Sequence, residues 1–154
     1  LLEQLARAHP GWSLVLIGPV GEGDPDTDVA ALSALANVHL LGPCPYSVLP
    51  AYLKGFDLGL LPLLFNAYTQ AMFPMKFFEY LAAGLPVVAS AIDALQPFAE
   101  LALLVDPTPE AFDAAIAAAL AGDGPSRSQR LAGAAAHTYR GRTEAMLRDI
   151  AALD

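Results

Sequence analysis

The sequence predicts an α/β fold, namely a doubly wound parallel sheet with helices on both faces. Five short apolar runs recur along the 154 residues. Most of them are continuous rather than alternating, as in strands that are buried on both faces of a parallel sheet. Segments with helical spacing and recognisable ends lie between the runs. Strands that alternate with helices in a chain of this length indicate one domain of the doubly wound class.

The apolar runs give the predicted strands, which are 13–17, 38–41, 57–61, 86–90 and 101–105. Residues 1–9 already have helical spacing, and we interpret them as the end of a helix that begins before Leu1. In a sheet with strand order 3-2-1-4-5-6, that helix follows the central strand. We therefore expect a fragment that lacks its first, central strand. It should show either an open slot or direct pairing of 13–17 with 57–61, and its free strand edges predict poor solubility.

Capping residues place the first predicted helices. Thr27 or Asp28 is expected to cap a helix that continues to about Asn37. Ser47 is expected to cap a short helix that reaches Lys54.

Proline and glycine place the later helices. Pro74 is suited to the first residue of a helix that closes at Gly84. Thr108 opens another helix, and two more are expected near 126–136 and 138–152. The helix after Thr108 has an apolar stripe that repeats every four residues, formed by Phe112, Ile116 and Leu120.

The composition excludes several classes of protein. Hydrophobic residues make up 55% of the chain and charged residues 16%, so the chain can bury enough surface to fold. The net charge of −8 provides no positive field for nucleic acid or anionic lipid. No apolar stretch approaches the roughly 20 residues that span a bilayer.

Several candidate motifs fail on spacing. The loop from Gly18 to Gly23 follows a predicted strand but does not have G-x-G-x-x-G spacing, and the acidic residues after it would repel a pyrophosphate. That acidic segment, 24–28, resembles the start of a calcium loop. Val29 and Leu35, however, stand where the loop needs Gly and Glu. We interpret the segment as a plain connection.

The histidines and the cysteine give no metal or catalytic cluster. His9, His39 and His137 are far apart in the sequence and are interpreted as structural residues. Cys44 is the one cysteine, so it can form neither an internal disulfide nor a thiolate cage, which fits a reducing compartment.

The segment 66–90 carries the strongest functional signal. A polar loop follows one strand and enters a helix that leads to the next strand, and ligands bind at the carboxyl ends of such strands. Lys76 in the first turn is unfavourable for the helix dipole unless an anion binds there. Glu79, one turn later, can accept hydrogen bonds from two ribose hydroxyls, whereas Phe77 and Leu81 are expected in the core. The alternative is a solvated Lys76–Glu79 pair worth a few tenths of a kcal/mol.

The segment 74–88 reads Pro-Met-Lys-Phe-Phe-Glu-Tyr-Leu-Ala-Ala-Gly-Leu-Pro-Val-Val and resembles the nucleotide-sugar signature of GT-B glycosyltransferases of the group 1 / group 4 type. Segments 12–19, 37–42 and 46–52 are also similar to that family. Residues 137–139 are similar to its closing segment, where Trp is more frequent than the Tyr of this chain. The resemblance covers nearly the whole chain and corresponds to the C-terminal, donor-binding domain, which has a Rossmann-like fold.

The resemblance implies a role for each site residue. Glu79 would hydrogen-bond the ribose of a nucleoside diphosphate sugar. Lys76 and the amides around Met75, directly after Pro74, would hold the diphosphate. The base would be framed by the loop Leu41-Gly42-Pro43-Cys44-Pro45.

The chain departs from the family pattern in two ways. Many relatives have a first carboxylate eight residues before the ribose-binding one, where this chain has Ala71. Asn66 and Thr69 are expected to supply polar contacts there, as in the branch whose loop is similar to Asn-x-Tyr-Thr. The family's glycine-rich first turn and its acceptor domain do not occur within these residues. We therefore expect the catalytic residues in a missing N-terminal domain and a fragment that binds without catalysing.

We interpret residues 1–154 as the donor-binding domain of a hexosyltransferase that moves a sugar from a nucleoside diphosphate sugar to an acceptor. The resemblance implies a UDP-sugar type of donor, a cell-envelope polysaccharide and a cytoplasmic protein with at most peripheral membrane contact through the missing half. No metal cofactor is expected, because no D-x-D stands in a suitable strand-end context. The alternatives are a nucleotide-sugar epimerase of the same fold and a non-catalytic flavodoxin-like interaction domain.

Overall fold

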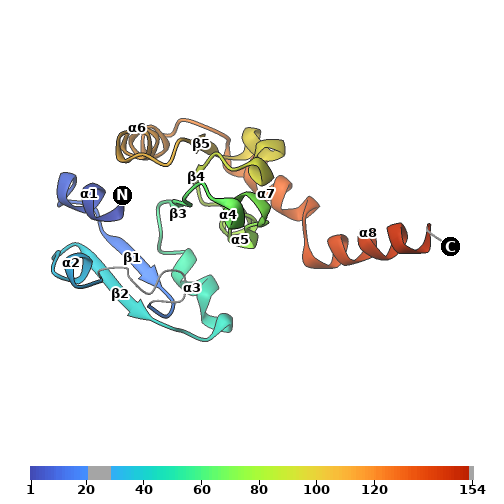
Figure 1. Ribbon diagram of the computed structural model, residues 1–154, viewed down its shortest axis with the longest axis horizontal. Coiled ribbons are helices and arrows are strands. Elements are labelled where there is room, and N and C mark those ends of the chain that lie inside the picture. The colour runs from blue at the N-terminus through green and yellow to red at the C-terminus, as the bar shows by residue number, and fades with distance from the viewer. Residues whose placement is uncertain (21–28, 153–154) are drawn as a thin grey trace.

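The computed structural model describes residues 1–20 and 29–152, and its strands form two parallel sheets (Figure 1). β1 (Leu14–Ile17) pairs with β2 (Val38–Gly42). The second sheet consists, in spatial order, of β3 (Gly59–Leu61), β4 (Val87–Ser90) and β5 (Leu103–Val105). The orders β2-β1 and β3-β4-β5 are those of a 3-2-1-4-5-6 sheet without its first strand. The predicted doubly wound α/β class, with its central strand missing, is confirmed.

No described strand joins the two sheets. Within the described residues β1 pairs only with β2 and β3 only with β4, so the direct pairing of 13–17 with 57–61 does not occur. The break lies at the position predicted for the central strand.

Helices alternate with the strands along the described chain. They are α1 (Leu2–Ala8), α2 (Val29–Ser33), α3 (Leu49–Leu53), α4 (Ala67–Ala71), α5 (Met75–Ala82), α6 (Pro109–Leu120), α7 (Arg127–Ala136) and α8 (Tyr139–Ala151), with 3-10 helices η1 (Tyr46–Val48) and η2 (Asp93–Leu101). The predicted cap of α6 is confirmed, because Thr108 accepts a hydrogen bond from the amide of Ala111 at 3.2 Å. In Figure 1, α8 extends away from the rest of the molecule. None of the described helices is both long enough and apolar enough to cross a membrane.

Helices cover both faces of the three-stranded sheet. Successive side chains of a strand point to opposite faces. Val87 and Ala89 of β4 accordingly pack against α5, η2 and α7, whereas Val88 packs against Leu5 of α1 and Phe112 of α6. This two-sided burial is the pattern that the continuous apolar runs predict. It does not extend to β2, where His39 and Leu41 are exposed on alternate positions.

α1 lies across the break between the sheets. Leu5 belongs to the core formed with β4 and α6, whereas Ala6 packs with Leu14 of β1 and Val38 of β2. The side chain of Trp12 contacts both cores. The two sheets are therefore held together by side-chain packing rather than by a shared strand.

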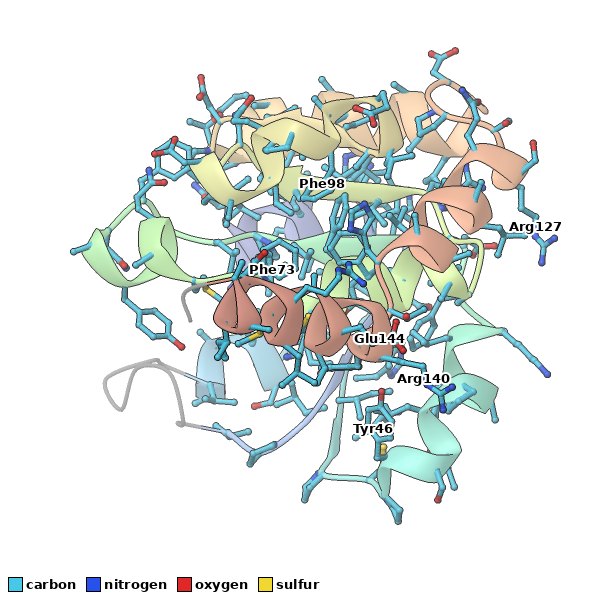
Figure 2. All side chains as sticks on the ribbon, turned by 90° about the vertical axis from the view of Figure 1, so that its right-hand side faces the viewer. Tyr46, Phe73, Phe98, Arg127, Arg140 and Glu144 are labelled. Atoms are coloured by element: carbon cyan, nitrogen blue, oxygen red, sulfur yellow. The ribbon has the colours of Figure 1, made fainter. Side chains whose placement is uncertain are left out.

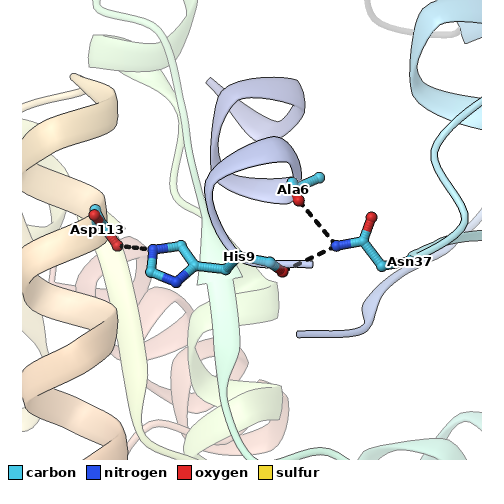
Figure 3. Close-up of polar contacts among 4 residues, drawn as sticks. All are labelled: Ala6, His9, Asn37 and Asp113. Atoms are coloured by element: carbon cyan, nitrogen blue, oxygen red, sulfur yellow. Dashed lines mark hydrogen bonds and ion pairs between the residues drawn. The ribbon is translucent and has the colours of Figure 1, made fainter. Parts of the chain in front are cut away.

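Polar contacts fix the end of α1 (Figure 3). His9 Nε2 lies 2.5 Å from a carboxylate oxygen of Asp113 on α6, and the His9 ring stacks on Trp12 with 3.7 Å between centroids. Asn37 donates through Nδ2 to the carbonyl oxygens of Ala6 and His9, at 3.0 Å each. These contacts give His9 the structural role assigned to it from the sequence.

The predictions for the first two helices after the first strand are wrong at their ends. The helix that we expect to continue to Asn37 ends at Ser33, because Asn37 is held by α1 and the segment 34–37 turns into β2. Its predicted caps, Thr27 and Asp28, lie outside the described residues. Ser47 is not a cap but lies inside η1, because the chain turns into the 3-10 helix directly after Pro45.

Three further expectations are wrong in detail. β3 begins at Gly59 rather than at residue 57. Leu101 ends η2 instead of beginning β5, because its buried side chain packs with α7. Leu120 is 48% exposed, because the buried stripe of α6 continues through Ala115 and Ala119.

The start of β3 tolerates no side chain. A Cβ atom at Gly59 would lie 2.5 Å from Cδ2 of the Tyr80 ring and 2.7 Å from Cγ, so the whole ring would have to move. Gly59→Ala should lower the free energy of unfolding by about 1–3 kcal/mol, the range for overpacking a core. Chemical denaturation measures this change. Gly11→Ala is the matched control, because a Cβ at Gly11 meets nothing within 4 Å. Equal stability of the two variants would contradict the packing described for Tyr80.

Candidate functional site

The first turn of α5 lies at the carboxyl end of β3, after the connection through α4. Pro74 is the N-cap of α5 rather than its first helical residue, and no side chain caps the helix. Phe77 and Leu81 are fully buried, which confirms the prediction that they belong to the core. The first turn is therefore held firmly while its amides receive no side-chain cap, which suits an anion.

Lys76 and Glu79 lie on α5 away from its buried face. Lys76 is exposed and forms no ion pair or hydrogen bond with any part of the chain that the structure describes. Glu79 is half-buried. The solvated Lys76–Glu79 pair, which is the structural alternative, is not formed.

The loop after β2 approaches α5 from the other sheet. Gly42, the last residue of β2, has φ +69°, a left-handed conformation that glycine adopts without a steric cost. Pro43, Cys44 and Pro45 follow, and Cys44 is half-buried with a free thiol. The predicted base-framing loop therefore leads directly into η1, which begins at Tyr46.

Tyr46 joins this loop to α5. Its hydroxyl donates a hydrogen bond to Oε1 of Glu79 at 2.9 Å, although the two residues are 33 positions apart. The hydrogen bond and the negative charge of Glu79 raise the pKa of Tyr46 above its ordinary value of 10.0. Tyr139, at the start of α8, contributes a smaller charge effect in the same direction. Figure 2 shows Tyr46 beneath α8, whose Arg140 and Glu144 are labelled.

The sequence alone assigns no role to Tyr46. The segment that begins at Tyr46 contributes to the family resemblance, but no local pattern predicts a contact with α5. The signal that was available is the pair of prolines around Cys44, which limits where the chain can place the next side chain.

Asn66 and Thr69 meet in a capping box at the start of α4. The amide of Thr69 donates to Asn66 Oδ1 at 2.8 Å, and the amide of Asn66 donates to Thr69 Oγ1 at 3.0 Å. Thr69 is 7% exposed, and its hydroxyl also contacts the carbonyl of Leu64. Thr69 is thus engaged by the fold, whereas Nδ2 of Asn66 has no partner among the described residues. A contact of either residue with a donor stays a prediction.

The site lies where the strand order reverses. In open parallel sheets, ligands bind outside the carboxyl ends of the strands at such a switch point. Here the β1–β2 side contributes the loop from Gly42 to Tyr46, and the β3–β5 side contributes Lys76 and Glu79 on α5. The Tyr46–Glu79 hydrogen bond brings the two sides together.

Other features of the surface lie away from these residues. An apolar groove of about 720 Å³ lies along β5, between α6 and η2, and contains none of the predicted site residues. The described residues include no group of three or more His, Cys, Asp or Glu side chains that could hold a metal ion.

Comparison with known proteins places the chain in a family. Residues 1–122 match the family model described as "Glycosyl transferases group 1". A protein of Bacillus subtilis (strain 168) named "Putative teichuronic acid biosynthesis glycosyltransferase TuaH" is 36% identical over 90 residues. That alignment covers 58% of this chain and 22% of the relative, so the match spans less than a quarter of the relative's length. The family match covers well over half of the chain and includes α5 and its site, and the chain therefore belongs to the group 1 glycosyl transferases.

Proposed function

We propose that this chain is the donor-binding part of a glycosyltransferase and that a nucleoside diphosphate sugar binds at the start of α5. One observation carries the proposal. The uncapped first turn of α5, with Lys76 free of partners among the described residues and Glu79 one turn later, lies at the switch point of the sheet.

A bound diphosphate would account for the position of Lys76 in the first turn of α5. A lysine in the first turn of a helix is repelled by the positive end of the helix dipole. A diphosphate placed there would attract both the lysine and the amides of the first turn, including that of Met75 after Pro74. The same groups would stabilise the leaving diphosphate during transfer without a metal ion.

A bound ribose would account for the carboxylate of Glu79 at this position. A carboxylate accepts hydrogen bonds through both oxygens, and bonds between a hydroxyl and a charged oxygen are stronger than neutral ones. Oε1 already accepts a bond from Tyr46, and Oε2 has no partner among the described residues. Two ribose hydroxyls can therefore bind this carboxylate.

The base and the sugar would bind on either side of Lys76 and Glu79. The loop of Gly42, Pro43 and Cys44 would frame the base. Asn66 would reach the sugar through Nδ2, and Thr69 would support Asn66 through the capping box. Ala71, at the end of α4, offers no carboxylate to the sugar hydroxyls.

We further propose that the whole protein is a hexosyltransferase with a UDP-sugar type of donor. Its catalytic residues would lie in an N-terminal acceptor domain. The name of the B. subtilis relative refers to teichuronic acid biosynthesis, which supports a cell-envelope polysaccharide as the class of product. A cytoplasmic location with at most peripheral membrane contact is part of this proposal and rests on the family resemblance.

A thermal-shift panel of UDP, GDP, dTDP and ADP on the full-length protein tests the proposal. We expect one base to give the largest increase in Tm, because ligands that bind only the folded state stabilise it. No shift with any of the four nucleotides would favour the non-catalytic interaction domain.

Replacing Glu79 should weaken nucleotide binding. Glu79→Ala in the full-length protein should cost about 1.5–3 kcal/mol in binding free energy, the range for hydrogen bonds to a charged group. Titration calorimetry with the nucleoside diphosphate selected by the panel measures this loss. Glu100→Ala, which removes an exposed carboxylate from η2, is the control and should leave Kd unchanged. An unchanged Kd for Glu79→Ala would exclude the ribose contact.

Replacing Lys76 should affect the diphosphate and not the nucleoside. Lys76→Met keeps much of the aliphatic stem but removes the charge, so we expect a loss of about 1.5–3 kcal/mol for the nucleoside diphosphate. The corresponding nucleoside should bind with unchanged affinity. Lys54→Met, which alters an exposed lysine at the end of α3, is the control. Equal losses for nucleoside and nucleoside diphosphate would contradict a diphosphate contact.

A further inference from the structure

We infer that Tyr46 is a positioning residue for Glu79, which it holds in the orientation that accepts the ribose hydroxyls. The inference rests on the proposed function and deepens it. It adds a residue from the β2 side of the molecule to a site whose charged groups come from α5. The observation behind it is the 2.9 Å hydrogen bond from the Tyr46 hydroxyl to Glu79 Oε1.

The backbone that carries Tyr46 is restrained. Pro45 precedes Tyr46 with φ −58° and ψ 136°, and the chain then enters η1. Proline fixes its own φ and restricts the residue before it, so Pro43 and Pro45 leave this loop few conformations. The Tyr46 side chain itself is 67% exposed and belongs to no buried core cluster. Its direction is therefore set by the loop and by the hydrogen bond, not by core packing.

The helix that carries Glu79 is restrained as well. The opposite face of α5 is buried through Phe77 and Leu81. Beyond the end of α5, the guanidinium of Arg130 on α7 donates to the carbonyl of Gly84 through Nε at 3.1 Å and Nη2 at 2.8 Å. Burial, and to a smaller degree Arg127, lowers the pKa of Arg130. With the buried face of α5 packed and the turn after its C-terminal end held, the position of the Glu79 carboxylate depends on rotation of the Glu79 side chain.

The hydrogen bond from Tyr46 removes that freedom without blocking the site. An ionised carboxylate has about four lone-pair positions, and Tyr46 uses one of them. Without Tyr46, binding would have to order a flexible side chain in addition to the ligand. A carboxylate already held in place avoids that cost, so Tyr46 should favour ligands that bond to Glu79 and be neutral toward ligands that do not.

Nucleotides with and without the ribose hydroxyls test this inference on the full-length protein. The probes are UDP and 2′,3′-dideoxy-UDP, or the corresponding nucleotide and its 2′,3′-dideoxy form for whichever base the panel selects. Tyr46→Phe removes only the hydroxyl and should weaken UDP binding about 2- to 10-fold, the cost of ordering one flexible side chain. It should leave the binding of 2′,3′-dideoxy-UDP unchanged, so that the ratio of the two Kd values falls toward that of Glu79→Ala. Tyr52→Phe on α3 is the control and should leave both Kd values unchanged.

The double variant separates positioning from a direct contact. In a Glu79→Ala background, Tyr46→Phe should cause no further loss, because there is no carboxylate left to position. Equal losses for UDP and 2′,3′-dideoxy-UDP, or a further loss in the Glu79→Ala background, would overturn the inference. If the unaltered protein binds none of the panel nucleotides, the proposed function fails first and this inference with it.

A titration without ligand gives a second readout. Comparing the ultraviolet titrations of the unaltered protein and Tyr46→Phe isolates the ionisation of Tyr46, whose pKa should lie above 10.0. Because this pKa is raised in the folded state, the bond contributes stability below about pH 10 and loses it as the pH rises through the folded-state pKa. Glu79→Gln should shift the titration to lower pH. A Tyr46 titration that is unchanged by Glu79→Gln would show that the contact is absent in solution and would overturn the inference.

Discussion

The burial of one face of α5 is the interaction on which the site depends. Phe77 and Leu81 are completely buried, and Arg130 of α7 donates hydrogen bonds to the carbonyl of Gly84 in the turn after the helix. Hydrophobic burial of this kind contributes about 1.5–3 kcal/mol for each large side chain. That is more than the dipole penalty of a lysine in the first turn, about 0.3–1 kcal/mol. The fold can therefore place Lys76 where an isolated helix would disfavour it and leave the first turn open to a ligand.

The second constraint is the break in the sheet. Among the described residues, the β1–β2 pair and the β3–β5 sheet share no ladder of hydrogen bonds. On one face of the sheet α1 connects them, with Leu5 in one core and Ala6 in the other. At the carboxyl edge Tyr46 reaches Glu79. The geometry of the site thus depends on how the two sides are held together, and a contact between them has a direct effect on the group proposed to bind ribose.

Much of the fold could be predicted because its signals are local. Apolar runs located the five strands of the described residues, and Pro74 with Gly84 located α5 to within a residue or two. The prediction that Ser47 caps a helix was wrong, because a 3-10 turn and an α-helix can begin from the same residues. Asn66 is of a residue type favoured at the N-cap, and this local signal would have predicted the start of α4. The Tyr46–Glu79 contact could not be predicted, because it joins η1, which follows β2, to α5, which follows β3, and leaves no periodic pattern in the sequence.

A crystal structure of the full-length protein with the nucleoside diphosphate that the panel selects would measure the proposed binding mode most directly. We expect the ribose hydroxyls roughly 2.5–2.7 Å from the carboxylate of Glu79, as for a hydroxyl donating to a charged oxygen. We also expect the diphosphate at the first turn of α5 beside Lys76, with the Tyr46–Glu79 hydrogen bond retained. A nucleotide bound elsewhere, for example in the groove along β5, or a Glu79 side chain turned away from the ribose, would contradict this binding mode.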